Sequence, residues 1–145
     1  MTQARVASRG HLPAGSLVVA LFAAFAAGCA AQQDRCGADE QRAVSDTLFF
    51  GTATPQGVVS AQDWSSFLAG TVTPQFPAGL TAWPASGQWQ SADGSLTHEN
   101  TYVLNILHPP GEAADAAIRS ITTQYRARFR QQAVLRVRTP ACTSF

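Results

Sequence analysis

The chain has 145 residues, which is enough for one domain of ordinary size but leaves little room for a second. Hydrophobic residues make up 46% of it and charged residues 13%, so a core can form and a charge-rich disordered protein is excluded. The formal net charge of +1 provides no strong overall field.

Residues 1–28 have the plan of a secretory signal peptide. Arg5 and Arg9 form a basic region, and residues 17–25 form an apolar run that is short for a permanent membrane span. Small residues then lead to Cys29, an ending that resembles the lipobox of bacterial lipoproteins. We expect Cys29 to carry lipid and to anchor the chain in the cell membrane or outer membrane. An ordinary signal peptide that is cut elsewhere, or a retained helical anchor, is the alternative.

Two further cysteines, Cys36 and Cys142, follow the proposed anchor. An exported domain would face the periplasm or the outside, where conditions are oxidising and paired cysteines form disulfides. We therefore expect a Cys36–Cys142 bridge that ties the start of the mature chain to its end, with two free thiols as the alternative. Nucleic acid is excluded as a partner in that compartment.

Residues 29–44 are mostly small or polar and are predicted to be a tether, and residues 45–145 are predicted to be the domain. The apolar and aromatic run 45–51 predicts the first strand, and the loop 52–59 follows it. Ser60 and Asp63 resemble a capping box at the start of the first helix. The apolar stripe of this helix, which Pro74 and Pro77 end, consists of Trp64, Phe67, Leu68 and Val72.

The second half of the chain repeats the alternation of strands and helix. A strand over 79–83 is predicted to be interrupted at 84–87 and to resume at 88–90, which suits an edge of the sheet because proline donates no hydrogen bond. Asp93-Gly94 predicts a hairpin turn, and 101–108 predicts a central strand. A helix over 112–130 has the stripe Ile118, Ile121, Tyr125 and Phe129, and a last strand over 133–139 ends at Pro140.

This order of elements predicts an α+β fold, the ferredoxin-like βαββαβ sandwich. Its four-stranded antiparallel sheet carries both helices on one face, and the first and third strands lie in the centre. We assign Asn105, Arg136 and Arg138 to the uncovered face. A dimer surface, or a face covered by the 52–59 loop and the tether, is favoured there over a ligand pocket.

The sequence contains no motif of an established chemistry. No metal-ligand spacing, phosphate-binding glycine loop or nucleophile elbow occurs, so we expect no metal and no cofactor. His98 and Glu99 precede the central strand and are the candidates for a general base, although a solvated loop carboxylate is the simpler interpretation of Glu99.

Several blocks stand out between about Asp46 and the end of the chain. The most specific are Pro74-Gln75-Phe76-Pro77, Gly79-Leu80-Thr81 and Gly87-Gln88-Trp89, joined by Asp63-Trp64, Val134-Leu135-Arg136-Val137 and Cys142-Thr143-Ser144-Phe145. Together these blocks resemble DUF3574, a bacterial family of uncharacterised domains whose members are often exported or lipid-anchored. The resemblance implies no activity, catalytic residue or cofactor.

We interpret the chain as a lipoprotein whose domain binds a small molecule or an envelope protein and forms a homodimer. If a pocket exists, Trp89 is expected to be its platform, and Gln88, Glu99 and Arg136 its polar anchors. One alternative is a small enzyme of the dimeric ferredoxin-like type that uses Glu99 or His98, an idea that rests on fold analogy. Another alternative is a structural envelope adaptor.

Overall fold

The computed structural model describes residues 36–90 and 93–145, so the predictions for the signal peptide and Cys29 lie outside the described residues. Cys36–Phe145 form a compact unit built on one four-stranded sheet. The strands are β1 (Gln41–Gly51), β4 (Thr81–Gln90), β5 (Leu96–His108) and β6 (Leu135–Thr143). Their order is β4-β5-β1-β6, and every neighbouring pair is antiparallel.

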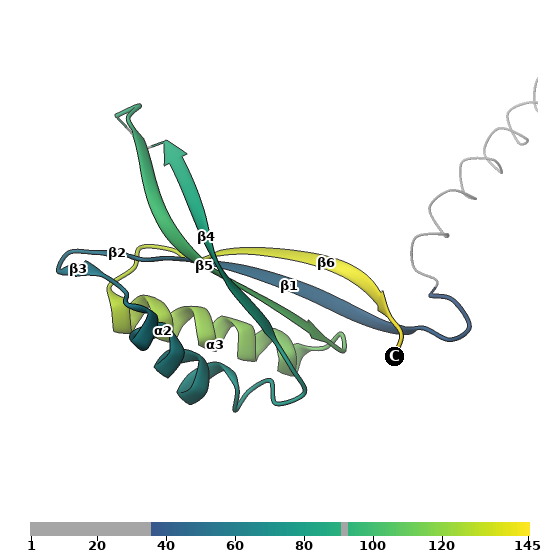
Figure 1. The fold of residues 1–145 in the computed structure, drawn as a ribbon. Coiled ribbons are helices and arrows are strands. Elements are labelled where there is room, and N and C mark those ends of the chain that lie inside the picture. Colours follow the sequence, from purple (N-terminus) through teal and green to yellow (C-terminus); the bar gives the residue numbers. More distant parts are fainter. Residues whose placement is uncertain (1–35, 91–92) are drawn as a thin grey trace, which may run out of the picture. The chain divides into compact units, whose positions relative to one another are not determined.

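Both helices lie on the same side of this sheet (Figure 1). The first is α2 (Ala61–Phe67), which continues as the π-helical turn η1 (Leu68–Val72), and the second is α3 (Glu112–Phe129). The predicted capping box is confirmed: the Ser60 hydroxyl accepts from the Asp63 amide, and the Asp63 carboxylate accepts from the Ser60 amide. These contacts satisfy amide groups that the first helical turn leaves without partners.

The core forms where the apolar side of the sheet meets the stripes of the two helices. In β1 the side chains alternate, and Leu48 and Phe50 are fully buried. The Phe50 ring lies 5.1 Å from the Trp64 ring and 4.6 Å from the Tyr125 ring, measured between centroids. The same cluster includes Phe67, Val72, Leu104, Ile106, Ile118 and Ile121. The buried residues that alternate along the strand therefore meet, in one core layer, the buried residues that recur about every 3.6 positions along the helices.

The edge strands are longer than the sequence predicts. Pro84 lies inside a continuous β4, and Pro140 lies inside β6, which does not end there. Both strands are at sheet edges, where one side of the backbone needs no partner and proline is tolerated. β1 also starts earlier than predicted, because residues 41–44, assigned to the tether, pair with residues 140–143 of β6.

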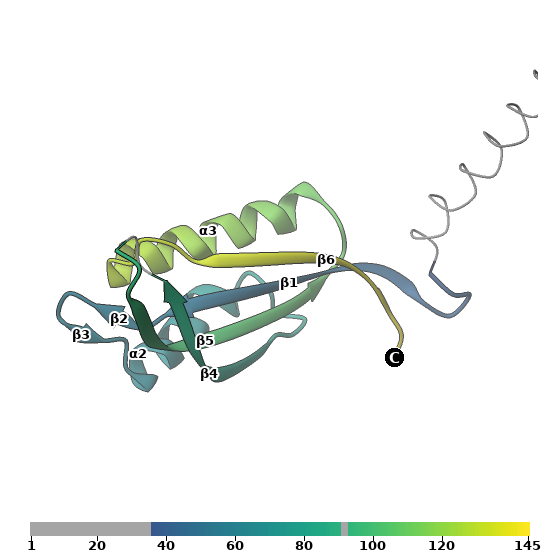
Figure 2. The same ribbon diagram turned by 90° about the horizontal axis from the view of Figure 1, so that it is seen from above.

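Two hairpins extend beyond the four-stranded part of the sheet. The predicted loop 52–59 contains a short hairpin, β2 (Ala53–Thr54) and β3 (Gly57–Val58). In addition, residues 96–100 of β5 pair only with β4, because β1 ends at Gly51, opposite Thr101. The resulting two-stranded arm rises on the side of the sheet away from the helices (Figure 1), and Figure 2 shows β4 and β5 from above.

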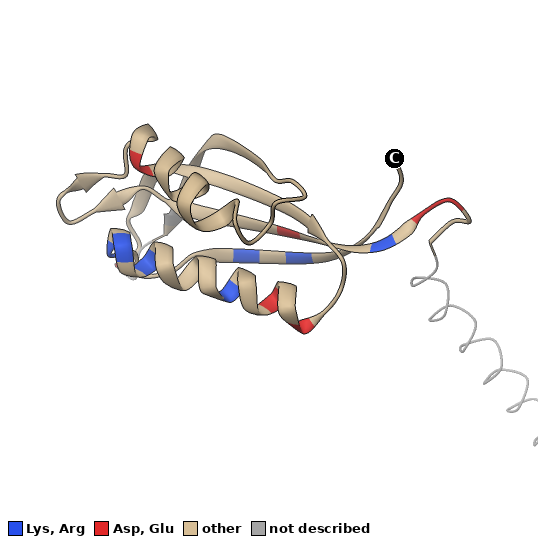
Figure 3. Ribbon diagram, turned by 90° about the horizontal axis from the view of Figure 1, so that it is seen from below, with Lys and Arg blue, Asp and Glu red and all other residues tan. Residues whose placement is uncertain are grey.

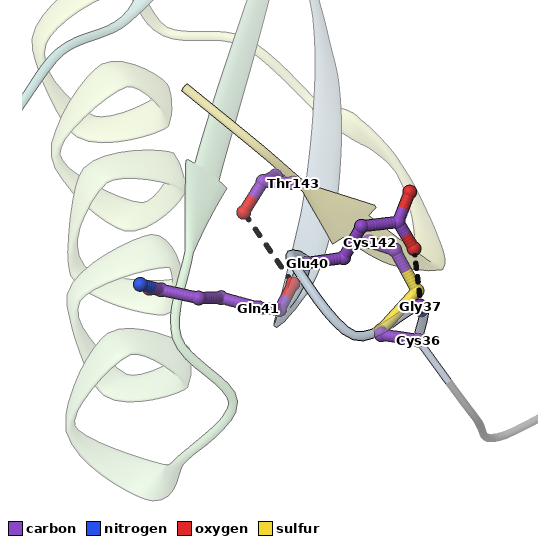
Figure 4. Close-up of a disulfide and its surroundings, with 6 residues drawn as sticks. All are labelled: Cys36, Gly37, Glu40, Gln41, Cys142 and Thr143. Carbon is purple, nitrogen blue, oxygen red and sulfur yellow. Dashed lines mark hydrogen bonds between the residues drawn. A yellow bond between two sulfur atoms is a disulfide. The ribbon is translucent and has the colours of Figure 1, made fainter.

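The predicted disulfide is confirmed between Cys36 and Cys142, whose Cα atoms are 5.5 Å apart (Figure 4). It joins the chain just before β1 to the end of β6. Beside it, the Gly37 amide donates to Glu40 Oε2 at 2.8 Å. The Glu40 carboxylate is near both sulfur atoms, but these are bonded to each other and offer no thiolate to a metal.

Within residues 36–90 and 93–145, neither helix is long and apolar enough to cross a membrane.

Candidate functional site

A groove of about 460 Å³ lies between the β2–β3 hairpin and the paired strands β4 and β5. Its lining consists of Thr52, Val58, Val59, Pro84, Ala85, Ser86, Asn100, Thr101 and Tyr102. None of these residues carries a charge at neutral pH. Polar residues with hydroxyl or amide groups alternate with small apolar ones, so the lining can form hydrogen bonds with a ligand but offers it no charge.

The walls of this groove are held by internal contacts. The Tyr102 ring stacks on the Trp64 ring, with 4.7 Å between centroids and 3° between planes. Trp64 is itself buried in the core, so it fixes the Tyr102 ring against the helix layer. On the opposite wall, the Thr52 hydroxyl donates to the Asn100 carbonyl at 2.7 Å, and the Thr52 carbonyl accepts from the Val59 amide at 2.8 Å. The groove is therefore preformed.

Glu99 supports the end of β1 and does not line the groove. Its Oε1 atom accepts a hydrogen bond from the Ala53 amide at 2.7 Å. A Cβ atom on Gly51 would lie 2.6 Å from the same oxygen, so glycine leaves the space that the carboxylate occupies. The Tyr125 hydroxyl donates to the Gly51 carbonyl at 2.8 Å, and burial raises the pKa of Tyr125, with the Glu99 charge adding to the shift.

A second candidate site is a charged cluster between the sheet and α3. Asp46 is fully buried in β1, and each of its carboxylate oxygens accepts a 2.7 Å hydrogen bond from the guanidinium of Arg136. His108 Nε2 lies 2.8 Å from Asp46 Oδ2, and His108 Nδ1 lies 2.8 Å from the Pro109 carbonyl oxygen. Both ring nitrogens thus lie within hydrogen-bond distance of an oxygen atom that can accept.

Asp115, in the first turn of α3, extends this cluster to the helix. Its Oδ1 atom accepts from Arg136 at 2.7 Å and lies 3.4 Å from Nη1 of Arg138, and its other oxygen pairs with Arg119. Figure 3 shows this gathering of basic residues along α3 and β6. The cluster joins β1, β5, β6 and α3, and all its members are engaged with one another.

The electrostatics of the cluster favour ionised partners. Burial by itself would raise the pKa of Asp46, but the hydrogen bonds from Arg136 and His108 outweigh it and lower that pKa. The hydrogen bond to Asp46 raises the pKa of Arg136. This arrangement is a buried salt bridge that fixes the position of the helix, and its polar atoms are not directed at the groove lining.

The predicted face of the two arginines is wrong. Arg136 and Arg138 share a face, as the alternation predicts, but it is the helix-covered face, where they meet Asp115. Asn105 does lie on the uncovered face, where its amide donates to the hydroxyls of Ser45 and Thr47. The error has a physical reason: buried carboxylates from two distant segments draw the arginines inward, and no local pattern in β6 records that.

The structure does not bring the four proposed ligand-binding residues together. Gln88 and Trp89 lie in the two-stranded arm, opposite His98 and Thr97, and Glu99 is engaged by the backbone of Ala53. Arg136 belongs to β6, at the other edge of the sheet. His98 is exposed on the arm.

Sequence reasoning missed the groove residues and the Asp46–His108 pair. Two signals were available for the pair: an aspartate that alternates with apolar residues on one face of a strand, and a histidine at the end of another strand. For the groove, the run of small residues Ala85-Ser86-Gly87 gave a weak signal, because small side chains leave space beside a strand. The partners of each residue are far apart in sequence, so only the fold reveals them.

Comparison with known proteins identifies the fold and the family. No curated protein matches the sequence. A phage SAM lyase solved in complex with S-methyl-5′-thioadenosine is similar in structure, with a TM-score of 0.54, 14% sequence identity, and coverage of 79% of this chain and 97% of that chain. Its apo form gives a TM-score of 0.53 and 13% identity, covering 77% of this chain and 94% of that chain. At these identities the likeness concerns the fold alone.

The family model for a protein of unknown function, DUF3574, matches residues 45–145, which are the sheet and both helices almost in full. This is the family that the sequence blocks suggested, and the chain belongs to DUF3574.

Proposed function

We propose that this chain is an exported lipoprotein, anchored through Cys29 to the cell membrane or outer membrane, whose domain binds a small uncharged molecule in the groove beside Tyr102. The groove is the observation that carries the binding proposal. Its volume of about 460 Å³ falls within the range of roughly 300–1,000 Å³ that is typical of ligand sites. The signal-peptide pattern that ends at Cys29 supports the anchor.

The architecture proposed for the domain is the ferredoxin-like one. The βαββαβ order of the main elements and the sheet order β4-β5-β1-β6 support this assignment.

The proposed ligand is neutral and carries both polar groups and an apolar or aromatic part. The lining offers the hydroxyl of Ser86, the amide of Asn100 and the ring of Tyr102, but no charged side chain to neutralise a phosphate or a carboxylate. A phage lyase of similar fold is solved with S-methyl-5′-thioadenosine, an uncharged nucleoside thioether. That compound is therefore a suitable first probe of the chemical class.

The enzyme alternative has less support than binding. Neither Glu99 nor His98 lines the groove, and one oxygen of Glu99 is already engaged by the Ala53 amide. A general base has to reach the proton that it removes, within about 3 Å or through one water. The adaptor alternative is compatible with the fold but leaves the groove without a role.

The test is native mass spectrometry of the full chain extracted from its own membrane, compared with a Ser86→Trp variant. The unmodified protein should show the mass of acylated Cys29, the loss of two hydrogens for the disulfide, and an added small molecule. Ser86→Trp should remove the added molecule, because Ser86 lines the groove on the same side of β4 and β5 as Tyr102, and the indole fills the groove there. Titration of both proteins with S-methyl-5′-thioadenosine then tests the ligand class.

Ala116→Trp is the matched control, since Ala116 is exposed on α3 and is not part of the groove lining. It should retain the added molecule. A Ser86→Trp protein that keeps the ligand would place binding elsewhere, and a chain that retains residues before Cys29 without acylation would overturn the anchor.

A further inference from the structure

The face of the sheet away from the helices carries no charged side chain in its central region. It consists of the odd-numbered residues of 43–49, 81–85, 101–107 and 135–141. Asp46, Arg136 and Arg138, the charged residues in the central parts of β1 and β6, point to the helices instead. Glu99, near the end of this face, is bonded to the Ala53 amide. We call the set of odd-numbered residues the open face.

The centre of the open face is an apolar row that crosses all four strands. Trp83, Val103, Phe49 and Leu135 are successive register partners. Trp83 is 43% exposed and Leu135 is 61% exposed, and nearby Val137 and Leu107 are 45% and 50% exposed. Four of the seven exposed large hydrophobic residues among the described ones therefore lie on this single face. An apolar patch of this continuity is typical of an interaction surface.

A polar group beside this row favours a protein partner over a lipid surface. The Asn105 amide donates to the hydroxyls of Ser45 and Thr47, at 2.8 and 2.9 Å. This leaves the Asn105 carbonyl oxygen and the hydroxyl hydrogens to bond across an interface. Hydrocarbon could not satisfy these groups, whereas a protein surface of the same composition could.

We propose that a second copy of this chain covers the open face, in a homodimer with two-fold symmetry. A two-fold interface brings the same patch of both copies together, so a patch that carries one sign of charge would repel itself. The open face avoids that penalty because it is uncharged, and interface cores are depleted in charge for the same reason. Its hydroxyl and amide groups can both donate and accept hydrogen bonds, so the same groups on the two copies can bond to each other.

The size of the open face also suits a dimer. The open face covers five to seven residues of each strand. Strands about 4.8 Å apart that rise about 3.3 Å per residue give it a flat area of roughly 400 Å². Protruding side chains and the adjoining arm enlarge that area toward the roughly 800 Å² per partner of a standard interface. The arm rises on this side of the sheet (Figure 1) and offers the partner a flank.

The tether does not fit the open face as an alternative occupant. Between the proposed anchor at Cys29 and the disulfide at Cys36 stand only Ala30-Ala31-Gln32-Gln33-Asp34-Arg35. These six residues include no large apolar side chain to cover Trp83 or Leu135, and two of them are charged. Their maximum reach of about 20 Å would also leave much of the face uncovered.

The test is sedimentation velocity of the Cys36–Phe145 fragment, which contains the entire sheet, both helices, the core and the disulfide. The unmodified fragment should be a dimer that dissociates on dilution. Val137→Asp should weaken dimerisation by about a hundredfold or more, since the symmetry buries two unpaired carboxylates. Acrylamide quenching of Trp83, measured as the difference from a Trp83→Phe variant, should increase when the dimer dissociates.

Val58→Asp is the matched control, because it introduces the same change at a 70% exposed valine off the open face. It should dimerise normally, and both variants should retain the circular dichroism and melting temperature of the folded monomer. A fragment that stays monomeric at every concentration overturns the proposal. A Val137→Asp variant that dimerises with unchanged affinity also overturns it. The dimer proposal does not depend on ligand binding in the groove. If the protein bound a ligand there as a monomer, only the dimer proposal would be contradicted.

Discussion

Asp46 is the residue on which the charged cluster depends. It is a fully buried carboxylate on the same face of β1 as the apolar residues Leu48 and Phe50, and it receives hydrogen bonds from Arg136 and His108. Burying two opposite charges costs solvation that their attraction only partly offsets, so such pairs stabilise a fold little in total. Removing one partner is far more damaging, because the other remains buried without compensation. The cluster therefore specifies how α3 docks.

We expect Asp46→Asn to lower the free energy of unfolding by about 3 kcal/mol at neutral pH. The folded state lowers the pKa of Asp46, so the stabilisation from its charge is complete above the pKa of an unfolded aspartate. It is lost as pH falls through the lower pKa of the folded state. The urea-unfolding curves of the variant and the unmodified protein should therefore converge in acid.

Glu112→Gln removes an equal charge at an exposed position in the first turn of α3. This change should lower the free energy of unfolding by less than about 1 kcal/mol at neutral pH. A constant difference between Asp46→Asn and the unmodified protein down to acid unfolding would show that the Asp46 charge is not the cause.

At the scale of the elements, local signals fix where α2 begins. The predicted capping box at Ser60 and Asp63 is present, and the hydrogen bonds within it lower the pKa of Asp63. The two proline-containing strands behave differently, because the effect of a proline depends on whether its strand lies at an edge. Pro84 and Pro140 lie inside edge strands without ending them.

Ser60→Ala should destabilise the domain by about 1 kcal/mol, because it removes the acceptor for the Asp63 amide. Thermal or urea unfolding measures the effect. Ser65→Ala, at an exposed position inside the same helix, should be neutral or slightly stabilising, since alanine has the higher helix propensity. Equal losses for the two variants would argue against a role for the cap.

At the scale of the whole molecule, the disulfide closes the fold. Cys36 and Cys142 are 106 residues apart in sequence, and the bridge joins the two ends of the paired strands β1 and β6. A cross-link over a loop of this length removes much conformational freedom from the unfolded chain. The ends of the unit are therefore tied together beside the point where the proposed tether begins.

The double variant Cys36→Ser, Cys142→Ser should lose roughly 4–5 kcal/mol of stability by the loop-entropy relation, which sets an upper figure. Either single serine variant should lose nearly as much, since each breaks the same bond. Urea unfolding of the oxidised proteins provides the measurement. Variants that are as stable as the unmodified domain would mean that the long loop contributes little.

The sequence by itself determined the family, the position of both helices, the central place of β1 and β5, and the disulfide. The helices and strands follow from local periodicity and capping, which depend on residues near one another. The disulfide follows from the two cysteines that remain once Cys29 is assigned to the proposed anchor. Periodicity also placed Arg136 and Arg138 on a common face, but it could not say which face.

Only the tertiary structure decided that question, because the carboxylates that hold the two arginines come from β1 and α3. It likewise extended β1 back to Gln41, since the pairing with β6 satisfies backbone groups that the sequence assigned to a tether. The groove beside Tyr102 is another feature that only the tertiary structure decided, because its walls come from the β2–β3 hairpin, β4 and β5. Burial and long-range hydrogen bonding set these features, and neither leaves a complete local pattern.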